Sequence, residues 1–167
     1  MRYVITHSID TDEQTFWDLF FDDEFNDALF IGHLKFKAHR VLSFERQPDG
    51  RITKRTEAAP AVELPSTVKK VVGDVTSYVE AGEFDPSTRR YTVDVTPGAA
   101  ADKVKTRVQI WVEARGDKRV DRYVEVDNTV RIFGVGKVVE KFIEQQTRDT
   151  YTHVAEFTNR WIKEKGL

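Results

Sequence analysis

Cysteine is absent from the sequence. The chain therefore forms no disulfide, offers no thiolate to a metal and has no cysteine nucleophile, and this absence leaves its compartment open. The sequence also lacks the run of about 18 apolar residues that a membrane-spanning helix needs, and no apolar stretch follows a basic start as in a signal peptide. We therefore expect a cytoplasmic protein without integral membrane association.

A large net charge is lacking as well. The 26 basic and 28 acidic residues give a net charge of −2 at pH 7, so no overall basic field attracts nucleic acid. Three basic residues, Lys103, Lys105 and Arg107, lie near Trp111. Carboxylates expected opposite two of them neutralise this patch, and we predict no nucleic acid partner.

Motifs for metal binding and for nucleophilic catalysis are missing too. The histidines show no metal-ligand spacing: His7, His33, His39 and His153. The acidic run at 22–27 lacks the glycine and spacing of a calcium loop, and no Gly-x-Ser-x-Gly elbow occurs. The sequence thus predicts no metal, no cofactor and no identifiable catalytic residue.

The C-terminal segment has no proline, and no glycine between Gly136 and Lys165. This predicts a helix over 134–165, on the order of 40 Å long. Apolar residues follow one side of it at three- and four-residue steps: Val135, Val139, Phe142, Val154, Phe157 and Trp161. Gln146 and Thr150 occupy the middle of this stripe, where a solid core would favour leucine or isoleucine. We predict that the helix closes one side of a β-lined cavity with Gln146 and Thr150 facing the space. The alternative, that they bond backbone groups or a buried water, stays open.

The rest of the chain predicts mainly strands. We expect them over 3–9, 36–46, 51–58, 74–84, 89–96, 103–114 and 118–132. Two short helices should follow the first strand, with Thr11 as N-cap and Gln14 completing a capping box. A short helix is also expected after Leu64, ended by Gly73. The order β-α-α-β6-α, with helices grouped on one face of an antiparallel sheet, indicates an α+β fold and a single domain over residues 1–167.

The last predicted hairpin has the clearest alternation. Its apolar residues share one face: Val104, Val108, Ile110 and Val112 in the first strand, and Val120, Val124 and Val126 in the second. A shared face requires an odd number of loop residues, and 115–117 provides three. The resulting register gives three opposite-charge pairs: Glu113 with Arg119, Arg107 with Glu125, and Lys105 with Asp127. It also turns Thr106, Arg122 and Asn128 inward.

This order of elements resembles the helix-grip fold of the START-like (SRPBCC) superfamily, which includes birch-pollen-allergen proteins, polyketide cyclases and START lipid carriers. The most specific local piece is FGVGKVVEKFIEQQ at 133–146. It looks like a bacterial branch of unknown function in that superfamily, and is similar to the start of the last helix in PRELI-type phospholipid carriers. The resemblance implies a curved sheet wrapped around the last helix and a cavity for an apolar ligand. It implies no particular reaction, because the superfamily has no universal catalytic motif.

Two charged residues are candidate anion contacts. An inward arginine costs several kcal/mol unless it is paired or hydrated, so we expect Arg122 to face a ligand's carboxylate or phosphate. The alternatives are a pair with Glu140 or Glu144, or contact with solvent. Lys137, beside free N–H groups at a helix start, is the candidate for an anion at the cavity mouth. Its segment fails the spacing of a phosphate loop, and a plain turn with a solvated lysine is the alternative.

We predict that the protein binds or carries a small apolar molecule, a lipid or an aromatic metabolite. The expected ligand-binding residues are Thr106, Val108, Ile110, Arg122, Val124, Asn128, Phe142, Gln146 and Thr150, which combine an apolar wall with few polar groups. Two alternatives stay open. One is an enzyme of the polyketide cyclase or dehydratase kind, with His39 or His7 as acid or base. The other is a protein-interaction module with a solid core and no ligand. The sequence predicts no oligomeric state.

Overall fold

The computed structural model describes residues 1–73, 77–99 and 101–167. Within them, seven strands form one antiparallel sheet in the order β1-β7-β6-β5-β4-β3-β2. The strands are β1 (Arg2–Ile9), β2 (Ala38–Arg46), β3 (Ile52–Ala59), β4 (Tyr78–Asp85), β5 (Arg90–Pro97), β6 (Val104–Ala114) and β7 (Val120–Val130). The helices are α1 (Glu13–Phe20), α2 (Asp23–Asp27), the π-helical η1 (Ala28–His33), α3 (Ser66–Val72) and α4 (Gly136–Lys165).

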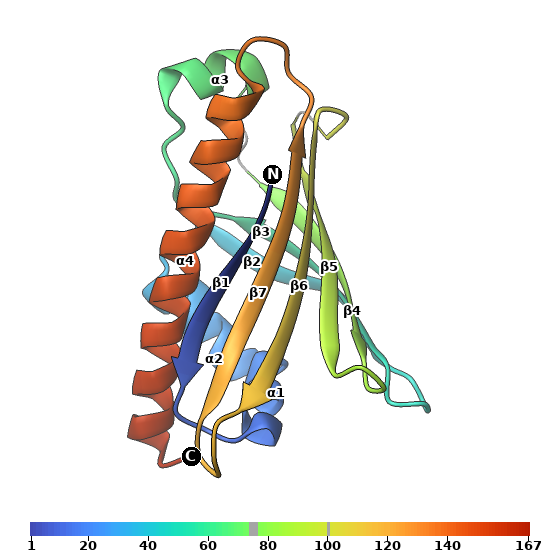
Figure 1. Cartoon of the computed structure of the whole chain (residues 1–167), viewed down its shortest axis with the longest axis vertical. Helices are drawn as coiled ribbons and strands as arrows, with labels where there is room; N and C mark the ends of the chain where they lie inside the picture. Colours follow the sequence, from blue (N-terminus) through green and yellow to red (C-terminus); the bar gives the residue numbers. More distant parts are fainter. Residues whose placement is uncertain (74–76, 100) are drawn as a thin grey trace.

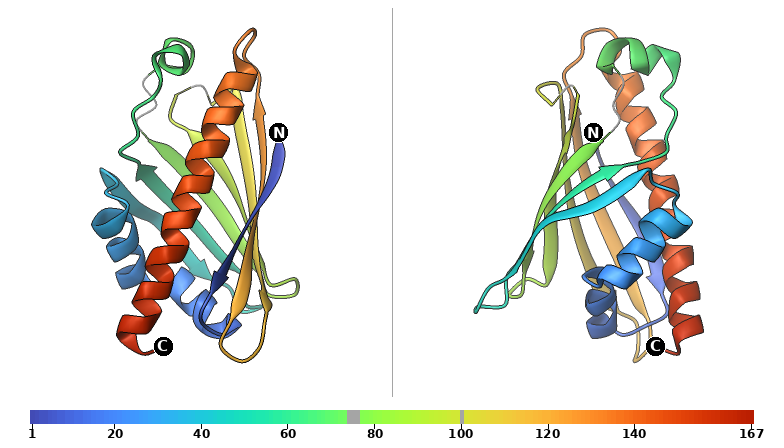
Figure 2. Two further views of the ribbon diagram at one scale, coloured as in Figure 1. Left: turned by 60° about the vertical axis from the view of Figure 1, so that its left-hand side comes forward. Right: turned by 180° about the vertical axis from the view of Figure 1, so that it is seen from behind.

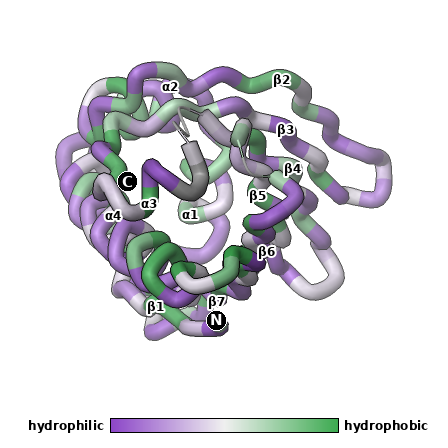
Figure 3. Tube along the Cα trace, turned by 90° about the horizontal axis from the view of Figure 1, so that it is seen from above, coloured by the Kyte–Doolittle hydropathy of each residue, from purple (hydrophilic) through white to green (hydrophobic). Residues whose placement is uncertain are grey.

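The sheet is curved, and α4 runs along its full length (Figure 1, Figure 2). Seen from above, the strands curl from β1 round to β2, and α4 lies across the open side (Figure 3). The predicted α+β helix-grip architecture is therefore confirmed. Of the strand predicted over 74–84, residues 74–76 lie outside the described part of the chain, and the strand is described from Tyr78.

The predicted N-cap of the first helix is wrong by one residue. Asp12 caps α1: its carboxylate accepts from the Thr15 backbone N–H at 2.9 Å and from the Thr15 hydroxyl at 2.8 Å. Thr11 is instead buried, and its N–H donates to the Ile9 carbonyl at 3.0 Å. A carboxylate satisfies the positively polarised helix start well, so the acidic residue takes the position.

The predicted register of the last hairpin has the right face and the wrong pairs. Ala114 lies opposite Val120, so the loop has five residues where three were expected. It closes through a hydrogen bond from Arg115 N to Arg119 O of 2.7 Å. Alternation determines only which residues share the apolar face. A change of the strand register by two residues keeps that face and changes every cross-strand pair.

None of the three expected charge pairs forms across this hairpin. Glu113 lies opposite Asp121, and the Arg115 side chain bridges the two at 3.0 Å and 2.8 Å. Glu125 pairs with Arg2 of β1 at 2.7 Å. Arg107 lies opposite Asp127, and its ion pair at 3.6 Å is with Asp94 of β5. The neighbouring strands β1 and β5 supply the partners of Glu125 and Arg107, and the loop of the hairpin supplies the partner of Glu113.

Two separate apolar clusters hold α4. The C-terminal part packs into the main core through Ala155, Phe157 and Ile162. The N-terminal part meets α3 in a small second cluster centred on Val139 and Val68. The middle of α4 lies between these clusters and faces a cavity.

Candidate functional site

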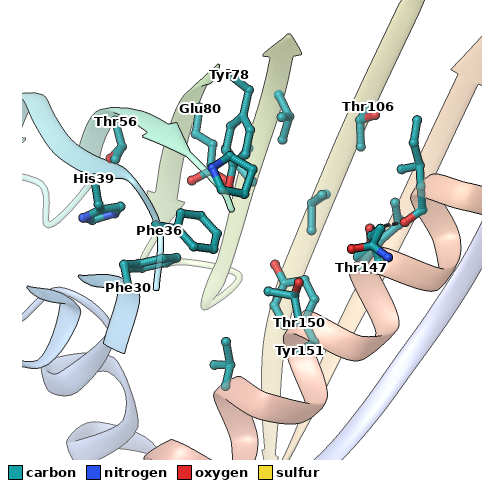
Figure 4. Close-up of a pocket in the computed structure, with 18 of the residues that line it drawn as sticks. Phe30, Phe36, His39, Thr56, Tyr78, Glu80, Thr106, Thr147, Thr150 and Tyr151 are labelled. Atoms are coloured by element: carbon teal, nitrogen blue, oxygen red, sulfur yellow. Dashed lines mark hydrogen bonds between the residues drawn. The ribbon is translucent and has the colours of Figure 1, made fainter. Parts of the chain in front are cut away.

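A cavity of about 390 Å³ lies between the sheet and α4. Its wall is built by residues of β2 to β7, by α3 and α4, and by the helices after β1. Most of it is apolar, with lining residues that include Phe20, Leu29, Phe30, Val93, Val108, Ile110 and Phe142. Figure 4 shows part of this lining, with Phe30 and Phe36 opposite the threonines of α4.

The middle of α4 presents polar side chains to the cavity. Gln146 and Thr150 both line it, and within the described chain neither side chain makes a hydrogen bond. The neighbouring Thr147 and Thr158 differ, because their hydroxyls donate to backbone carbonyls one turn earlier, at 2.7 Å and 2.6 Å. Gln146 and Thr150 therefore keep their hydrogen-bonding groups available to an occupant.

Arg122 lies on the inward face of β7 and is only 3% exposed. Its Nη2 donates to the Tyr151 carbonyl at 2.9 Å and lies 3.2 Å from Nδ1 of His7, while its Nε has no partner. Among the described residues no carboxylate pairs with it, so the alternative partners Glu140 and Glu144 are wrong. Burial lowers the pKa of the Arg122 guanidinium to about 10. A buried, unneutralised cation lines the cavity.

Three predicted contacts lie away from the cavity wall. Asn128 is fully buried, accepts a hydrogen bond from Thr106 Oγ1 at 3.1 Å, and belongs to the packing behind the wall. Val124 is likewise fully buried, in the main core. Lys137 is exposed at the start of α4 and does not line the cavity. The remaining predicted residues, Thr106, Val108, Ile110, Arg122, Phe142, Gln146 and Thr150, all line it.

A second polar group, which the sequence reasoning missed, faces the cavity from β3 and β4. Lys54 lines the cavity and is 8% exposed. Burial lowers the pKa of its ammonium, although nearby carboxylates oppose this. Glu80 lines the cavity from the next strand, and burial raises the pKa of its carboxyl to about 7, with Lys54 acting in the other direction.

Three tyrosines complete this group. Tyr78, Tyr91 and Tyr151 line the cavity, and burial, followed by the charge of Glu80, raises the pKa of each hydroxyl. Figure 4 shows Tyr78 and Glu80 side by side on β4, facing Tyr151 on α4.

Of the two histidines considered, only His39 lines the cavity. Its ring stacks on Phe30 with centroids 4.0 Å apart, and burial lowers its pKa to about 4. His7 lies between Arg122 and Thr152. His39 is therefore neutral at pH 7, and it lines the cavity with its ring stacked on the ring of Phe30.

A signal for Lys54 is present in the sequence. The inward residues of β3 alternate as Ile52, Lys54, Thr56 and Ala58, and all four are buried. A lysine is rarely buried, so a lysine among the inward-facing residues of an alternating strand indicates an unusual position. Glu80 carries the same signal, since it shares its phase with Tyr78 and Phe84.

Within the residues that the structure covers, no group of three or more His, Asp or Glu side chains is placed to hold a metal ion. Over the same residues, no helix has both the length and the hydropathy needed to cross a bilayer.

The sequence matches a family model described as "Protein of unknown function (DUF2505)" over residues 5–162. No curated protein matches it. Several solved structures do. Norcoclaurine synthase from Thalictrum flavum, in complex with a transition state analogue, is 18% identical with a TM-score of 0.70, and the match covers 100% of this chain and 98% of that one. Another structure of that enzyme holds dopamine and hydroxybenzaldehyde.

Two further similar structures carry different descriptions. A START superfamily protein from Mycobacterium smegmatis is 15% identical with a TM-score of 0.64, covering 98% of this chain and 97% of that one. The Zhui aromatase/cyclase from Streptomyces sp. R1128 is 12% identical with a TM-score of 0.64, covering 96% and 94%. At these identities the likeness is one of fold, and it confirms the START-like helix-grip fold. Of these neighbours, norcoclaurine synthase is described in complex with ligands, and the Zhui protein is described as an aromatase/cyclase.

Proposed function

This chain belongs to the DUF2505 family, and we propose that it binds a small hydrophobic molecule, a lipid or an aromatic metabolite. The observation that carries the proposal is the cavity of about 390 Å³ with a mostly apolar wall and a few inward polar groups. Small-molecule sites have this construction and a volume of roughly 300–1,000 Å³.

The proposed ligand has a polar end. Among the residues that the structure describes, the Gln146 amide and the Thr150 hydroxyl make no hydrogen bond, and the buried Arg122 cation has no acidic partner. A buried cation is costly unless something compensates it, and a ligand carboxylate or phosphate would do so. The aromatic option is further supported by the dopamine and hydroxybenzaldehyde bound to norcoclaurine synthase, a protein of the same fold.

Native mass spectrometry of gently purified protein tests the proposal directly. We expect a co-purified molecule, and we expect delipidated protein to gain thermal stability when an apolar ligand is added. An empty protein that no apolar compound stabilises would overturn the proposal.

A cavity-filling pair of variants locates the site. Thr150→Phe places a ring in the cavity and should weaken binding of an apolar fluorescent probe by about tenfold or more. Lys141→Phe adds the same ring at an exposed position of α4 and should leave the affinity within about twofold. Equal effects of both variants would place the ligand elsewhere.

A reaction of the cyclase or dehydratase kind is a second candidate, favoured by Glu80. A cavity carboxyl with a pKa of about 7 is suited to general acid–base catalysis near neutral pH. Glu80→Gln should then abolish turnover of a substrate that still binds.

A further inference from the structure

Lys54 is held in a setting that favours a neutral amine. It projects from the inward face of β3 between Ile52 and Thr56, and all three are buried. Across the described chain its ammonium makes no hydrogen bond and no ion pair. An unpaired ammonium in an apolar cavity is costly, and such a group tends to lose its proton.

The side chains of Glu80 and Tyr91, which can donate or accept protons, lie on strands close to the Lys54 amine. Lys54 lies opposite Gly82, and Thr56 lies opposite Glu80, so Lys54 and Glu80 are diagonal neighbours with backbones roughly 7–8 Å apart. A Cβ on Gly82 would lie 1.9 Å from the Tyr91 hydroxyl. The hydroxyl therefore occupies the space of the missing side chain, next to Lys54.

From this juxtaposition we propose that the cavity captures an apolar aldehyde or ketone by forming an imine with the Lys54 amine. The inference rests on the proposed function, because the carbonyl compound must first occupy the cavity. The amine attacks the carbonyl carbon, and proton transfer from nitrogen to oxygen gives a carbinolamine. Glu80 then donates its proton to the hydroxyl, which leaves as water while the C=N bond forms. The iminium returns a proton to the Glu80 carboxylate, so the amine and the carbonyl compound give an imine and water.

Charges from several elements act on the amine. Asp23 and Asp27 of α2 and Glu80 of β4 favour the ammonium, whereas burial favours the amine and has the largest effect. His39 of β2 is neutral at pH 7, because burial and Lys54 lower its pKa to about 4. A lysine that is desolvated in this way is the type used for Schiff-base chemistry.

The test is reductive trapping on the unmodified chain. The protein is incubated at pH 7 with 2-naphthaldehyde and sodium cyanoborohydride, and adducts are located by peptide mass spectrometry. We expect Lys54 to gain one naphthylmethyl group about tenfold or more faster than exposed Lys141, because the cavity holds the aldehyde beside a desolvated amine. The advantage of Lys54 should shrink as the pH rises and exposed lysines lose their protons. Labelling of Lys54 no faster than Lys141 would overturn the inference.

Variants and a probe without a carbonyl separate this inference from the proposed function. Lys54→Met should lose the fast adduct, Lys141→Met should keep it, and Glu80→Gln should form it at least about tenfold more slowly. The alcohol 2-naphthalenemethanol cannot form an imine, so its binding to wild type, and an affinity about tenfold or more lower in Thr150→Phe, report occupation of the cavity alone. If the alcohol binds and no Lys54 adduct forms, the imine is refuted while ligand binding stands. If neither probe engages the cavity, both proposals fail.

Discussion

Burial moves the pKa values of Glu80 and His39 in opposite directions. The folded chain holds the Glu80 proton up to a pH of about 7, whereas an ordinary glutamate releases it near 4.5. Between these values the folded state binds more protons, so rising pH destabilises it. His39, with its pKa lowered from 6.5 to about 4, acts the other way, since the unfolded state binds more protons there and rising pH stabilises the fold. The two effects oppose each other over most of the same pH range.

Glu80→Gln isolates one of them. The variant and wild type should be equally stable near pH 4, where the Glu80 carboxyl is protonated. The variant should then gain on wild type as the pH rises from about 4.5 to about 7, by about 3 kcal/mol, and the difference should level off above that range. Urea unfolding from pH 4 to 8 measures it. Glu83→Gln, on the exposed side of the same strand, is the control and should show no such slope; a flat difference for Glu80→Gln would contradict the prediction.

Arg122 sets the charge preference of the cavity. Replacing it with methionine keeps most of the volume and removes the cation. Arg122→Met should weaken binding of a long-chain carboxylate by about 1.5–3 kcal/mol, because a hydrogen bond to a charged group is lost. The matching alcohol should bind nearly as before. Calorimetric titration of both ligands checks this, and equal losses for acid and alcohol would show that Arg122 acts by packing alone.

At the scale of elements, β4 and β5 fit together through one missing side chain. Gly82→Ala would press a methyl group against the buried Tyr91 hydroxyl, 1.9 Å away. Overpacking of this kind costs about 1–3 kcal/mol. Most of that cost should disappear in a Tyr91→Leu background, where the space is free. A double-mutant cycle by urea unfolding measures the coupling, and strictly additive effects would rule out the contact as the cause.

The sequence predicted the strands and helices well, but it predicted poorly which residues pair between them. Alternation identified the inward faces of β6 and β7, since a one-residue slip would expose every valine. It did not identify the pairing, because Glu125 and Arg107 find their partners on strands outside the hairpin, Arg2 on β1 and Asp94 on β5. Likewise the period of α4 placed Gln146 and Thr150 on the side that lines the cavity. The alternation of β7 did not predict that Asn128 would be fully buried outside the cavity lining.

The cavity's second polar group was missed for a related reason. Lys54 and Glu80 meet only because β3 pairs with β4 in one register, which the sequence did not determine. Each stands out in its own strand as a charged residue in an apolar phase. Their juxtaposition is a property of the sheet.

At the scale of the whole molecule, the cavity is closed at one end by a small core. Val68 of α3 packs on Val139 of α4 in a cluster separate from the main core. With few apolar contacts, α3 should open at a lower free energy than the rest of the fold. Hydrogen exchange should therefore be fast in α3 and slow in β7. A bound ligand should slow exchange in α3 by touching Leu64 and Val68, which line the cavity; exchange in α3 that is unchanged by a saturating ligand would contradict this.

The two-point attachment of α4 has a consequence for how such a protein diversifies. Its ends are fixed by Val139 on one side and by Phe157 and Ile162 on the other, and Gln146 and Thr150 between them belong to neither cluster. Substitutions at Gln146 and Thr150 can then alter which ligand fits the cavity with little loss in the free energy of unfolding. A lineage built on this scaffold is free to change its chemistry one side chain at a time.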